Sequence, residues 1–153
     1  MRFALLAVLF LSPLGFAKSL SERVGFGVSN FGPNLVPALS VDWRPTEATS
    51  FEANLALNTS SQSNLLDLGI RYWRNLYIED NLYYALYVGA GLISQRVSGS
   101  NQSGFTLSGG AGSHFSFPSF PNLAFSYGGG IRLSTQGSTA FLTELFVGIH
   151  YYF

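Results

Sequence analysis

The chain is poor in ionised side chains, and the few it has are its first candidates for chemistry. Eight Lys and Arg and eight Asp and Glu occur in 153 residues. Where polar and apolar residues alternate, one face carries six titratable groups: Glu52, Asp67, Arg71, Arg132, Glu144 and His150. Charges confined to such a face need partners to offset their desolvation. The pattern predicts a structural ion-pair network, with a proton or ion path as the alternative.

Several other kinds of site lack the residues they need. The absence of cysteine excludes a disulfide framework, a thiol nucleophile, a cysteine metal site and a lipoprotein anchor. The two histidines, His114 and His150, make a poor case for a metal, and the glycine runs 109–112 and 128–130 lack the Lys-Ser/Thr of a phosphate-binding loop. A formal net charge of zero gives no electrostatic case for nucleic acid. We therefore expect no metal, no cofactor and no nucleic-acid partner.

The elements that carry these residues are alternating segments of one kind. Side chains on a β-strand point to opposite faces in turn, and no helical periodicity competes over a comparable length. Eight strands are predicted, at 22–30, 39–44, 51–58, 66–73, 83–92, 105–117, 123–134 and 139–153. Turns or loops are predicted between them, including a longer link at 74–81 and a polar loop at 96–104.

Eight antiparallel strands with short links are expected to close into a barrel, because closure removes unpaired edges. An apolar face turned inward would give a soluble ligand-binding barrel, whose exterior would normally carry far more than the 10% charged residues found here. An apolar face turned outward gives a membrane barrel with a polar lumen. An eight-stranded barrel is just wide enough for its side chains to fill it, so no water pore is expected.

The N-terminus has the form of a targeting segment. Arg2 supplies a positive start, residues 3–14 supply an apolar run, and Gly15 and Ala17 are small residues at the positions that a signal peptidase reads. The run is shorter than the about 20 residues of a membrane-spanning helix, and Pro13 ends it. The prediction is a signal peptide at 1–17 and one barrel domain at 18–153.

The final segment ends in an aromatic motif. Gly148, Tyr151 and the terminal Phe153 resemble the C-terminal assembly signal of bacterial outer-membrane β-barrels, although Phe146 stands where a polar residue is usual. Together with the signal peptide and the eight amphipathic segments, the mature chain resembles the small OmpA-type and OmpX-type outer-membrane barrels.

The resemblance implies an orientation and a set of partners. Both termini would lie in the periplasm, the links around Gly32, Ser61, Ser100 and Gly137 would face outward from the cell, and those around Thr46, Tyr77 and Ser119 would face the periplasm. The implied partners are outer-membrane lipids, lipopolysaccharide and the barrel-assembly machinery, which would read the C-terminal strand. A monomer is expected.

Aromatic residues then gather toward the two predicted rims. An interfacial girdle is expected, because amphipathic rings favour the membrane boundary. Its periplasmic members would be Trp43, Phe51, Tyr72, Trp73, Tyr77, Tyr83, Tyr84, Phe117, Phe120, Tyr151 and Phe153, and its outer members Phe31, Phe105 and Phe141. Within the lumen, glycines on the strands predicted at 83–134 leave room that Trp73, Tyr83, Tyr87 and Phe146 are expected to fill.

The polar loop at 59–64 predicts one ion pair. If it is centred between Ser61 and Gln62, Glu52 lies directly opposite Arg71 on the neighbouring strand, and both point inward.

A catalytic alternative rests on a second resemblance. The spacing of His114 and Ser116 is found in outer-membrane lipid A deacylases, where a histidine, a serine and a glutamate resemble a hydrolase triad. Parity places both side chains in the lumen, away from lipid, and Glu144 falls near the opposite end of its strand. The favoured hypothesis is a structural or surface-interacting outer-membrane barrel, with a lipid A-modifying enzyme and a secreted ligand-binding barrel as alternatives.

Overall fold

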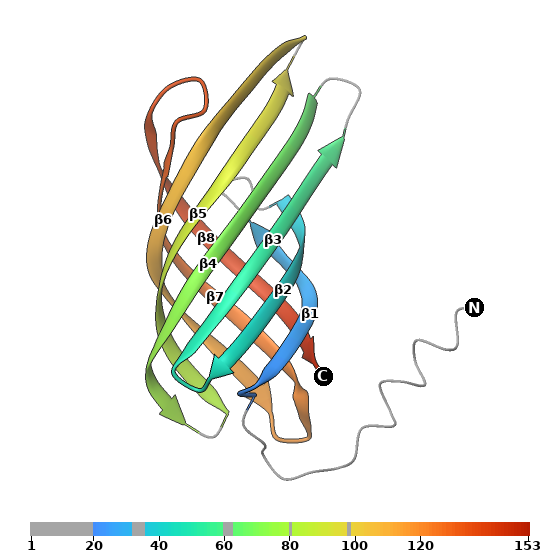
Figure 1. Cartoon of the computed structure of the whole chain (residues 1–153), viewed down its shortest axis with the longest axis vertical. Helices are drawn as coiled ribbons and strands as arrows, with labels where there is room; N and C mark the ends of the chain where they lie inside the picture. The colour runs from blue at the N-terminus through green and yellow to red at the C-terminus, as the bar shows by residue number, and fades with distance from the viewer. Residues whose placement is uncertain (1–19, 32–35, 60–62, 80, 98) are drawn as a thin grey trace, which may run out of the picture.

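The computed structural model of the chain describes residues 20–31, 36–59, 63–79, 81–97 and 99–153. Extended backbone dominates, as the alternating sequence predicts (Figure 1). Eight strands are formed: β1 (Arg23–Phe31), β2 (Val36–Thr46), β3 (Thr49–Thr59), β4 (Ser63–Glu79), β5 (Leu82–Val97), β6 (Ser100–Phe117), β7 (Phe120–Ser134) and β8 (Ala140–Tyr152). Within the described residues, no helix has the length and apolar character needed to cross a bilayer.

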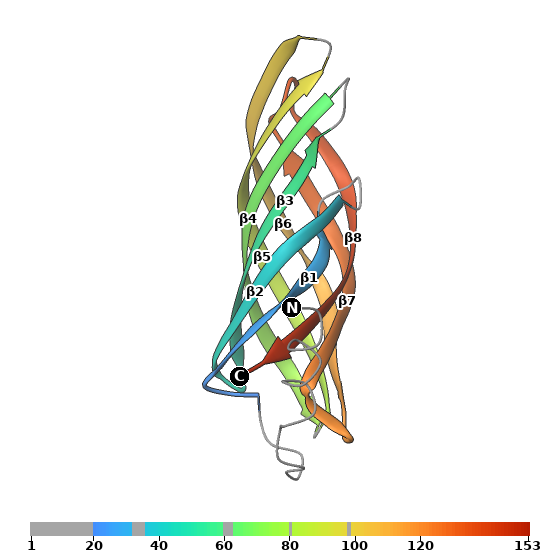
Figure 2. The same ribbon diagram turned by 90° about the vertical axis from the view of Figure 1, so that its right-hand side faces the viewer.

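The strands form a closed barrel in which each one pairs with its neighbours in the sequence. Every pairing is antiparallel, including the β1–β8 pairing that closes the barrel, from Gly25 opposite Tyr152 to Ser29 opposite Gly148. Figure 2 turns this closure toward the viewer. The predicted all-β, eight-stranded, antiparallel up-and-down barrel is confirmed.

The up-and-down order places alternate links at opposite ends of the barrel (Figure 1). We call the end that carries the β2–β3, β4–β5 and β6–β7 links and Phe153 the C-terminal rim, and the other end the far rim. Gly137, in the β7–β8 link, therefore lies at the far rim. The predicted signal peptide at 1–17 and the link centres at Gly32 and Ser61 fall outside the described residues.

Two predicted links are wrong in extent. Most of the link expected at 74–81 belongs to β4, and most of the loop expected at 96–104 belongs to β5 and β6, which leaves Ser100 in a strand. In the second case the polar residues predict a loop, but the ladder continues to the pair Val97 and Ser100, and Gly99 has a φ of 87° at the turn. Strand pairing satisfies the backbone N–H and C=O groups of these residues, whatever the polarity of their side chains.

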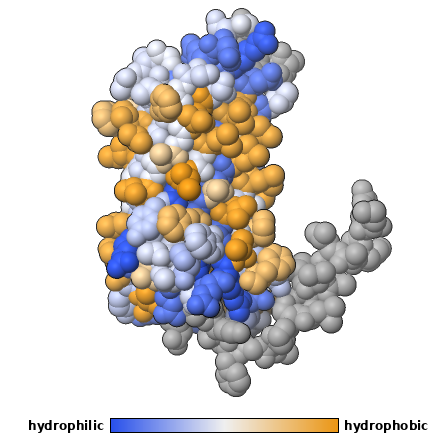
Figure 3. Space-filling view, viewed as in Figure 1, coloured by the Kyte–Doolittle hydropathy of each residue, from blue (hydrophilic) through white to orange (hydrophobic). Residues whose placement is uncertain are grey.

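The two faces of the barrel differ sharply in composition. In β2 buried and exposed residues alternate from Val36 to Arg44, with Ser40, Asp42 and Arg44 inside and Leu39, Val41 and Trp43 outside. The same alternation leaves large apolar side chains exposed on all eight strands, and Figure 3 shows them over much of the visible wall, below a polar upper end. The apolar face therefore points outward, and the buried charged residues line the lumen: Asp42, Arg44, Glu52, Asp67, Arg71, Arg132 and Glu144.

Candidate functional site

The middle of the lumen is organised around Arg71 of β4. Glu52 and Arg71 are register partners across β3 and β4, and Arg71 Nη1 lies 3.6 Å from Glu52 Oε2. Arg71 Nη2 also donates a hydrogen bond to Glu144 Oε1, which comes from β8 on another part of the wall. All three side chains are buried. One guanidinium thus lies between two carboxylates, so each buried carboxylate has a cation beside it, and the three groups together carry a formal charge of −1.

A second ion pair crosses the lumen between β7 and β4. Arg132 Nη2 lies 2.9 Å from Asp67 Oδ1 and 2.7 Å from Asp67 Oδ2, and both residues are buried. The contact ties together two strands that do not pair with each other. The ion pair therefore links two parts of the wall that the backbone ladder does not connect directly.

His150 joins the Arg71 group through a hydroxyl. Its Nε2 lies 2.7 Å from Ser40 Oγ, and that hydroxyl lies 3.2 Å from Glu52 Oε1, with Ser40 as the donor to the carboxylate. Trp73 Nε1 donates to the other oxygen of Glu52 at 3.0 Å. The six residues singled out in the sequence therefore occupy two groups, one containing Glu52, Arg71, Glu144 and His150, and one containing Asp67 and Arg132.

Sequence reasoning missed a third group, near the C-terminal rim. Arg44 Nε lies 3.1 Å from Asp42 Oδ2 and 3.0 Å from the hydroxyl of Tyr152, which itself donates to Asp42. The Arg44 guanidinium also lies 5.4 Å from the ring centre of Tyr83 and 5.2 Å from that of Tyr152, within cation–π range. Asp42 and Arg44 alternate with outward-pointing residues in the sequence, which places both on the polar face. This alternation is the signal that could have added them to the predicted network.

Aromatic rings fill the space beside the Arg71 group. Trp73, Tyr87 and Phe146 are buried, with ring centres 4.8 to 5.6 Å apart. Glycines of β6 and β7 face these rings. A Cβ at Gly112 would lie 2.9 Å from Phe146 Cζ, and a Cβ at Gly128 would lie 2.5 Å from the same atom, so a side chain at either position would collide with the ring. Glycines there let the rings lie against the backbone, as the sequence predicted for these three residues. Tyr83 instead packs against Arg44.

A small apolar cluster lies near the C-terminal rim. Leu20, Ala124 and Tyr152 form a buried cluster, and the amide of Glu22 donates to the carbonyl of Arg44 at 2.6 Å. Glu22 adopts a φ of 62°, a left-handed conformation that turns the chain into β1. The start of the described chain thus packs against β7 and β8 near this rim.

His114 and Ser116 do not form a hydrolytic arrangement with Glu144. Both side chains are buried in the lumen, where His114 Nδ1 lies 2.8 Å from Arg44 Nη2 and the ring packs 4.8 Å from that of Trp73. A triad needs a carboxylate on one imidazole nitrogen and the serine on the other. An arginine can only donate, so Nδ1 of His114 accepts that bond. Glu144 is engaged by Arg71 instead.

The residues of the predicted assembly signal lie on two faces of β8. Gly148 points inward, where a Cβ would lie 2.6 Å from Ser126 Oγ. The rings of Tyr151 and Phe153 pack edge to face with centres 5.0 Å apart, and the Phe153 amide donates to the Val24 carbonyl at 3.1 Å. Phe153 is exposed and also contacts Phe26, so the last residue lies against the β1–β8 closure.

The predicted girdle separates into outward and inward rings. Trp43, Phe51 and Tyr72 form a row on the outer face of β2, β3 and β4, with ring centres 5.6 and 5.4 Å apart, and Tyr77 lies beside Tyr84 at 6.1 Å. Trp73 and Tyr83 are buried and belong to the lumen, which corrects their place in an outer girdle. Both residues occupy positions whose side chains point inward in the alternation of their strands. The side chain of Phe31 falls outside the described residues.

The fold and its lumen define a class, the closed eight-stranded antiparallel up-and-down barrel with charged residues inside. Among the described residues, no group of three or more His, Cys, Asp or Glu side chains is placed to hold a metal ion. No protein-family model, no curated protein and no solved structure matches the chain.

Proposed function

We propose that the protein is a small integral outer-membrane β-barrel, with a packed polar lumen and a structural or surface-interacting role. The observation that carries this proposal is the inside-out distribution of its residues. Large apolar side chains are exposed on every strand, whereas Asp42, Arg71, Arg132 and Glu144 are buried inside. An exterior of this kind suits hydrocarbon, where a closed barrel also satisfies every backbone group between its strands.

The rims of the barrel support the same proposal. The outward rings of Trp43, Tyr77 and Tyr84 gather toward the C-terminal rim, close to the β2–β3 and β4–β5 links. Rings with one polar edge are favoured at the boundary between hydrocarbon and headgroups. With the signal peptide predicted at 1–17, this rim would be the periplasmic one and the far rim would face outward from the cell.

The packed lumen supports a structural or interacting role over transport. Ion pairs, aromatic rings and the Leu20 cluster occupy successive parts of the interior. The surfaces left for interaction are then the outer wall and the far rim. The proposed partners are outer-membrane lipids, lipopolysaccharide and the barrel-assembly machinery, and the protein would act as a monomer.

A charge placed on the outer wall tests the proposal. Val88 is 61% exposed near the middle of β5, beside Tyr72 and Gly109. In a bilayer, Val88→Arg should destabilise the barrel by about 2–4 kcal/mol, since arginine near the midplane is costly. Urea unfolding in phospholipid vesicles measures this, and gel migration with and without heating reports folding.

The matched control adds the same charge at the far rim. Ser100→Arg changes an exposed residue at the tip of the β5–β6 hairpin and should shift stability by no more than about 0.5 kcal/mol. If Val88→Arg were as mild as Ser100→Arg, or if the protein stayed soluble and folded without lipid or detergent, the membrane proposal would be wrong.

A further inference from the structure

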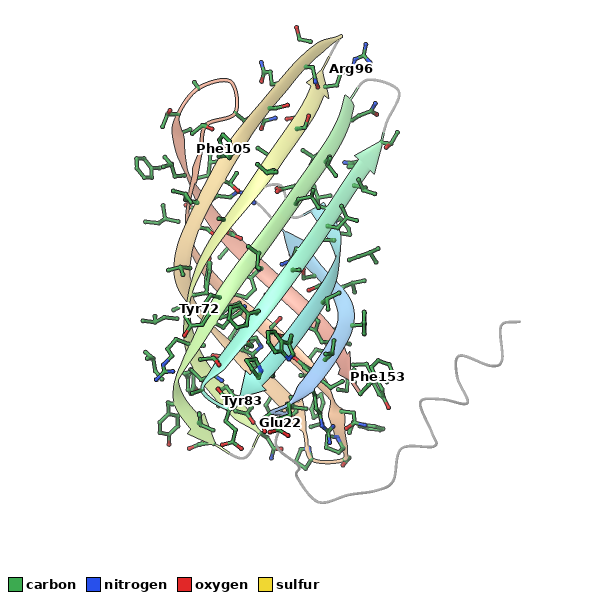
Figure 4. All side chains as sticks on the ribbon, viewed as in Figure 1. Glu22, Tyr72, Tyr83, Arg96, Phe105 and Phe153 are labelled. Carbon is green, nitrogen blue, oxygen red and sulfur yellow. The ribbon has the colours of Figure 1, made fainter. Side chains whose placement is uncertain are left out.

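A graded surface crosses the outer wall of β4, β5 and β6 toward the far rim. Three successive rungs of the ladder run from apolar to polar: Leu68–Leu92–Phe105, then Leu66–Ser94–Ser103, then Asn64–Arg96–Asn101. All of the apolar side chains in these rungs are exposed. The hydroxyls of Ser94 and Ser103 lie 3.0 Å apart, so the middle rung presents a joined hydroxyl pair. Figure 4 labels Arg96 near the hairpin tip and Phe105 below it.

The lower rungs border a groove. A hollow of about 370 Å³ lies between β4, β5 and β6, with Leu66, Leu92 and Phe105 on its apolar sides and Ser94 and Ser103 at its polar edge. A second hollow of about 460 Å³ shares Leu68 and Leu92 with the first and continues across β3 to Leu39 and Val41 of β2. The small side chains of Ala53 and Ala90 lie along this second hollow.

Arg96 supplies the charge at the top of this surface. It is exposed, and within the part of the chain that the structure describes it forms no ion pair with an acid. It is also the single charged residue between Asp80 and Arg132 in the sequence. An isolated exposed arginine above a hydroxyl pair and an apolar groove offers complementary contacts to an anionic phosphate, a sugar and an acyl chain, in that order.

The spacing agrees with the thickness of a headgroup layer. Leu92 and Arg96 are separated by four residues, which on a strand tilted by about 40° corresponds to a rise of about 10 Å. The headgroup region of one leaflet is about 5–8 Å thick. A lipid whose chain lies in the groove would therefore bring its headgroup to the level of Ser94 and Arg96.

We propose that this surface binds one phosphorylated glycolipid of the outer leaflet, with an acyl chain in the groove, sugar hydroxyls at Ser94 and Ser103, and a phosphate at Arg96. The assignment rests on the membrane-barrel function proposed above and names its lipid partner. It selects a glycolipid over a glycerophospholipid because the hydroxyl pair lies between the groove and the cation, where a sugar has groups to bond.

Native mass spectrometry of the detergent-folded mature chain tests the assignment, with bis-phosphorylated lipid A and phosphatidylglycerol as the two probes. We expect lipid A to bind about tenfold more tightly, because both lipids offer Arg96 a phosphate but only lipid A offers sugar groups to Ser94 and Ser103. Arg96→Gln should weaken lipid A binding about fivefold. Ala90→Phe, which fills the groove, should weaken both lipids.

The control variant is Arg74→Gln, which removes an exposed arginine from the outer face of β4 toward the C-terminal rim and should leave lipid A binding unchanged. Gel migration with and without heating checks that each variant is folded. Equal affinity for the two lipids, or no effect of Arg96→Gln in a folded barrel, would overturn the assignment while leaving the membrane barrel intact. A chain that does not fold in detergent would overturn both.

Discussion

For the lumen, the sequence predicted which side chains point inward and one pairing between neighbouring strands, but not the contacts that cross the barrel. Parity along each strand placed Glu52, Asp67, Arg71 and Arg132 inside, and the register of one hairpin placed Glu52 opposite Arg71. The bond from Arg71 to Glu144 joins residues that are 73 positions apart in the sequence and lie on β4 and β8, two strands that do not pair. Such contacts depend on how far the barrel curves and on which side chains reach across it. The alternation of polar and apolar residues specifies neither the curvature of the barrel nor the reach of its side chains.

The Arg71 bridge leads to a stability prediction. Arg71→Met leaves the carboxylates of Glu52 and Glu144 buried without their shared cation, and should cost about 3–5 kcal/mol of unfolding free energy. Adding Glu144→Leu removes one of the stranded charges, so the double variant should be more stable than Arg71→Met alone. Urea unfolding of the refolded barrel measures both.

Arg74 provides the comparison for this prediction on the same strand. It is exposed on the outer face, so Arg74→Met should change stability by no more than about 0.5 kcal/mol. Equal losses for Arg71→Met and Arg74→Met would show that the buried bridge contributes nothing to the fold.

At the scale of the strands, the sequence located the centres well and the ends poorly. β4, β5 and β6 have 17, 16 and 18 residues, more than the segments predicted from alternation. At the far rim the ladder of β5 and β6 extends through Ser, Asn and Gln residues, which were interpreted as a loop. At the C-terminal rim the register shifts between Asn75 and Tyr77, so Leu76 and Tyr77 are both exposed and the alternation is interrupted. Such an irregularity ends a sequence pattern without ending a strand.

The end of β8 leads to a prediction about assembly. Deleting Phe153 removes one backbone bond to Val24 and ring contacts to Phe26 and Tyr151, which are small losses for the folded barrel. If the C-terminus is also an assembly signal, the deletion should lower the amount of protein in the outer membrane severalfold while purified protein still refolds in detergent. Cell fractionation and gel migration with and without heating measure the two effects.

Phe141→Ala is the matched variant, because Phe141 is another exposed phenylalanine of the same strand, 76% exposed and far from the C-terminus. It should reach the outer membrane at nearly the normal level. A Phe153 deletion that accumulates like Phe141→Ala would remove the assembly role from Phe153.

For the whole molecule, the decisive feature is that its polar and apolar faces are exchanged relative to a soluble barrel. The 10% charged content and the alternation predicted this arrangement from the sequence. What composition could not predict is how fully the interior is occupied, because that depends on the facing glycines at 110, 112, 128 and 130, which make space for Tyr87 and Phe146. Packing of this kind is a property of opposed walls rather than of any one segment.

Occupation of the lumen leads to a prediction about conductance. With Arg44, Arg71 and Trp73 all buried and Leu20 packed against Ala124 and Tyr152, the purified barrel should produce no discrete conductance steps in a planar lipid bilayer. The measurement is single-channel recording at physiological salt, with a known open porin reconstituted in parallel. Reproducible steps from the folded protein would contradict a packed interior.

The two tryptophans allow the most direct test of the central claim, that the outer wall contacts lipid and the lumen does not. Trp43 is 50% exposed on the outer face, whereas Trp73 is fully buried inside. In vesicles of dibrominated phospholipid, which quenches nearby indoles, the single-tryptophan variant Trp73→Phe reports on Trp43, and Trp43→Phe reports on Trp73. We predict strong quenching of Trp43 and little quenching of Trp73. An unquenched Trp43 in a folded, vesicle-bound protein, or quenching of Trp73 to the same degree, would contradict the account.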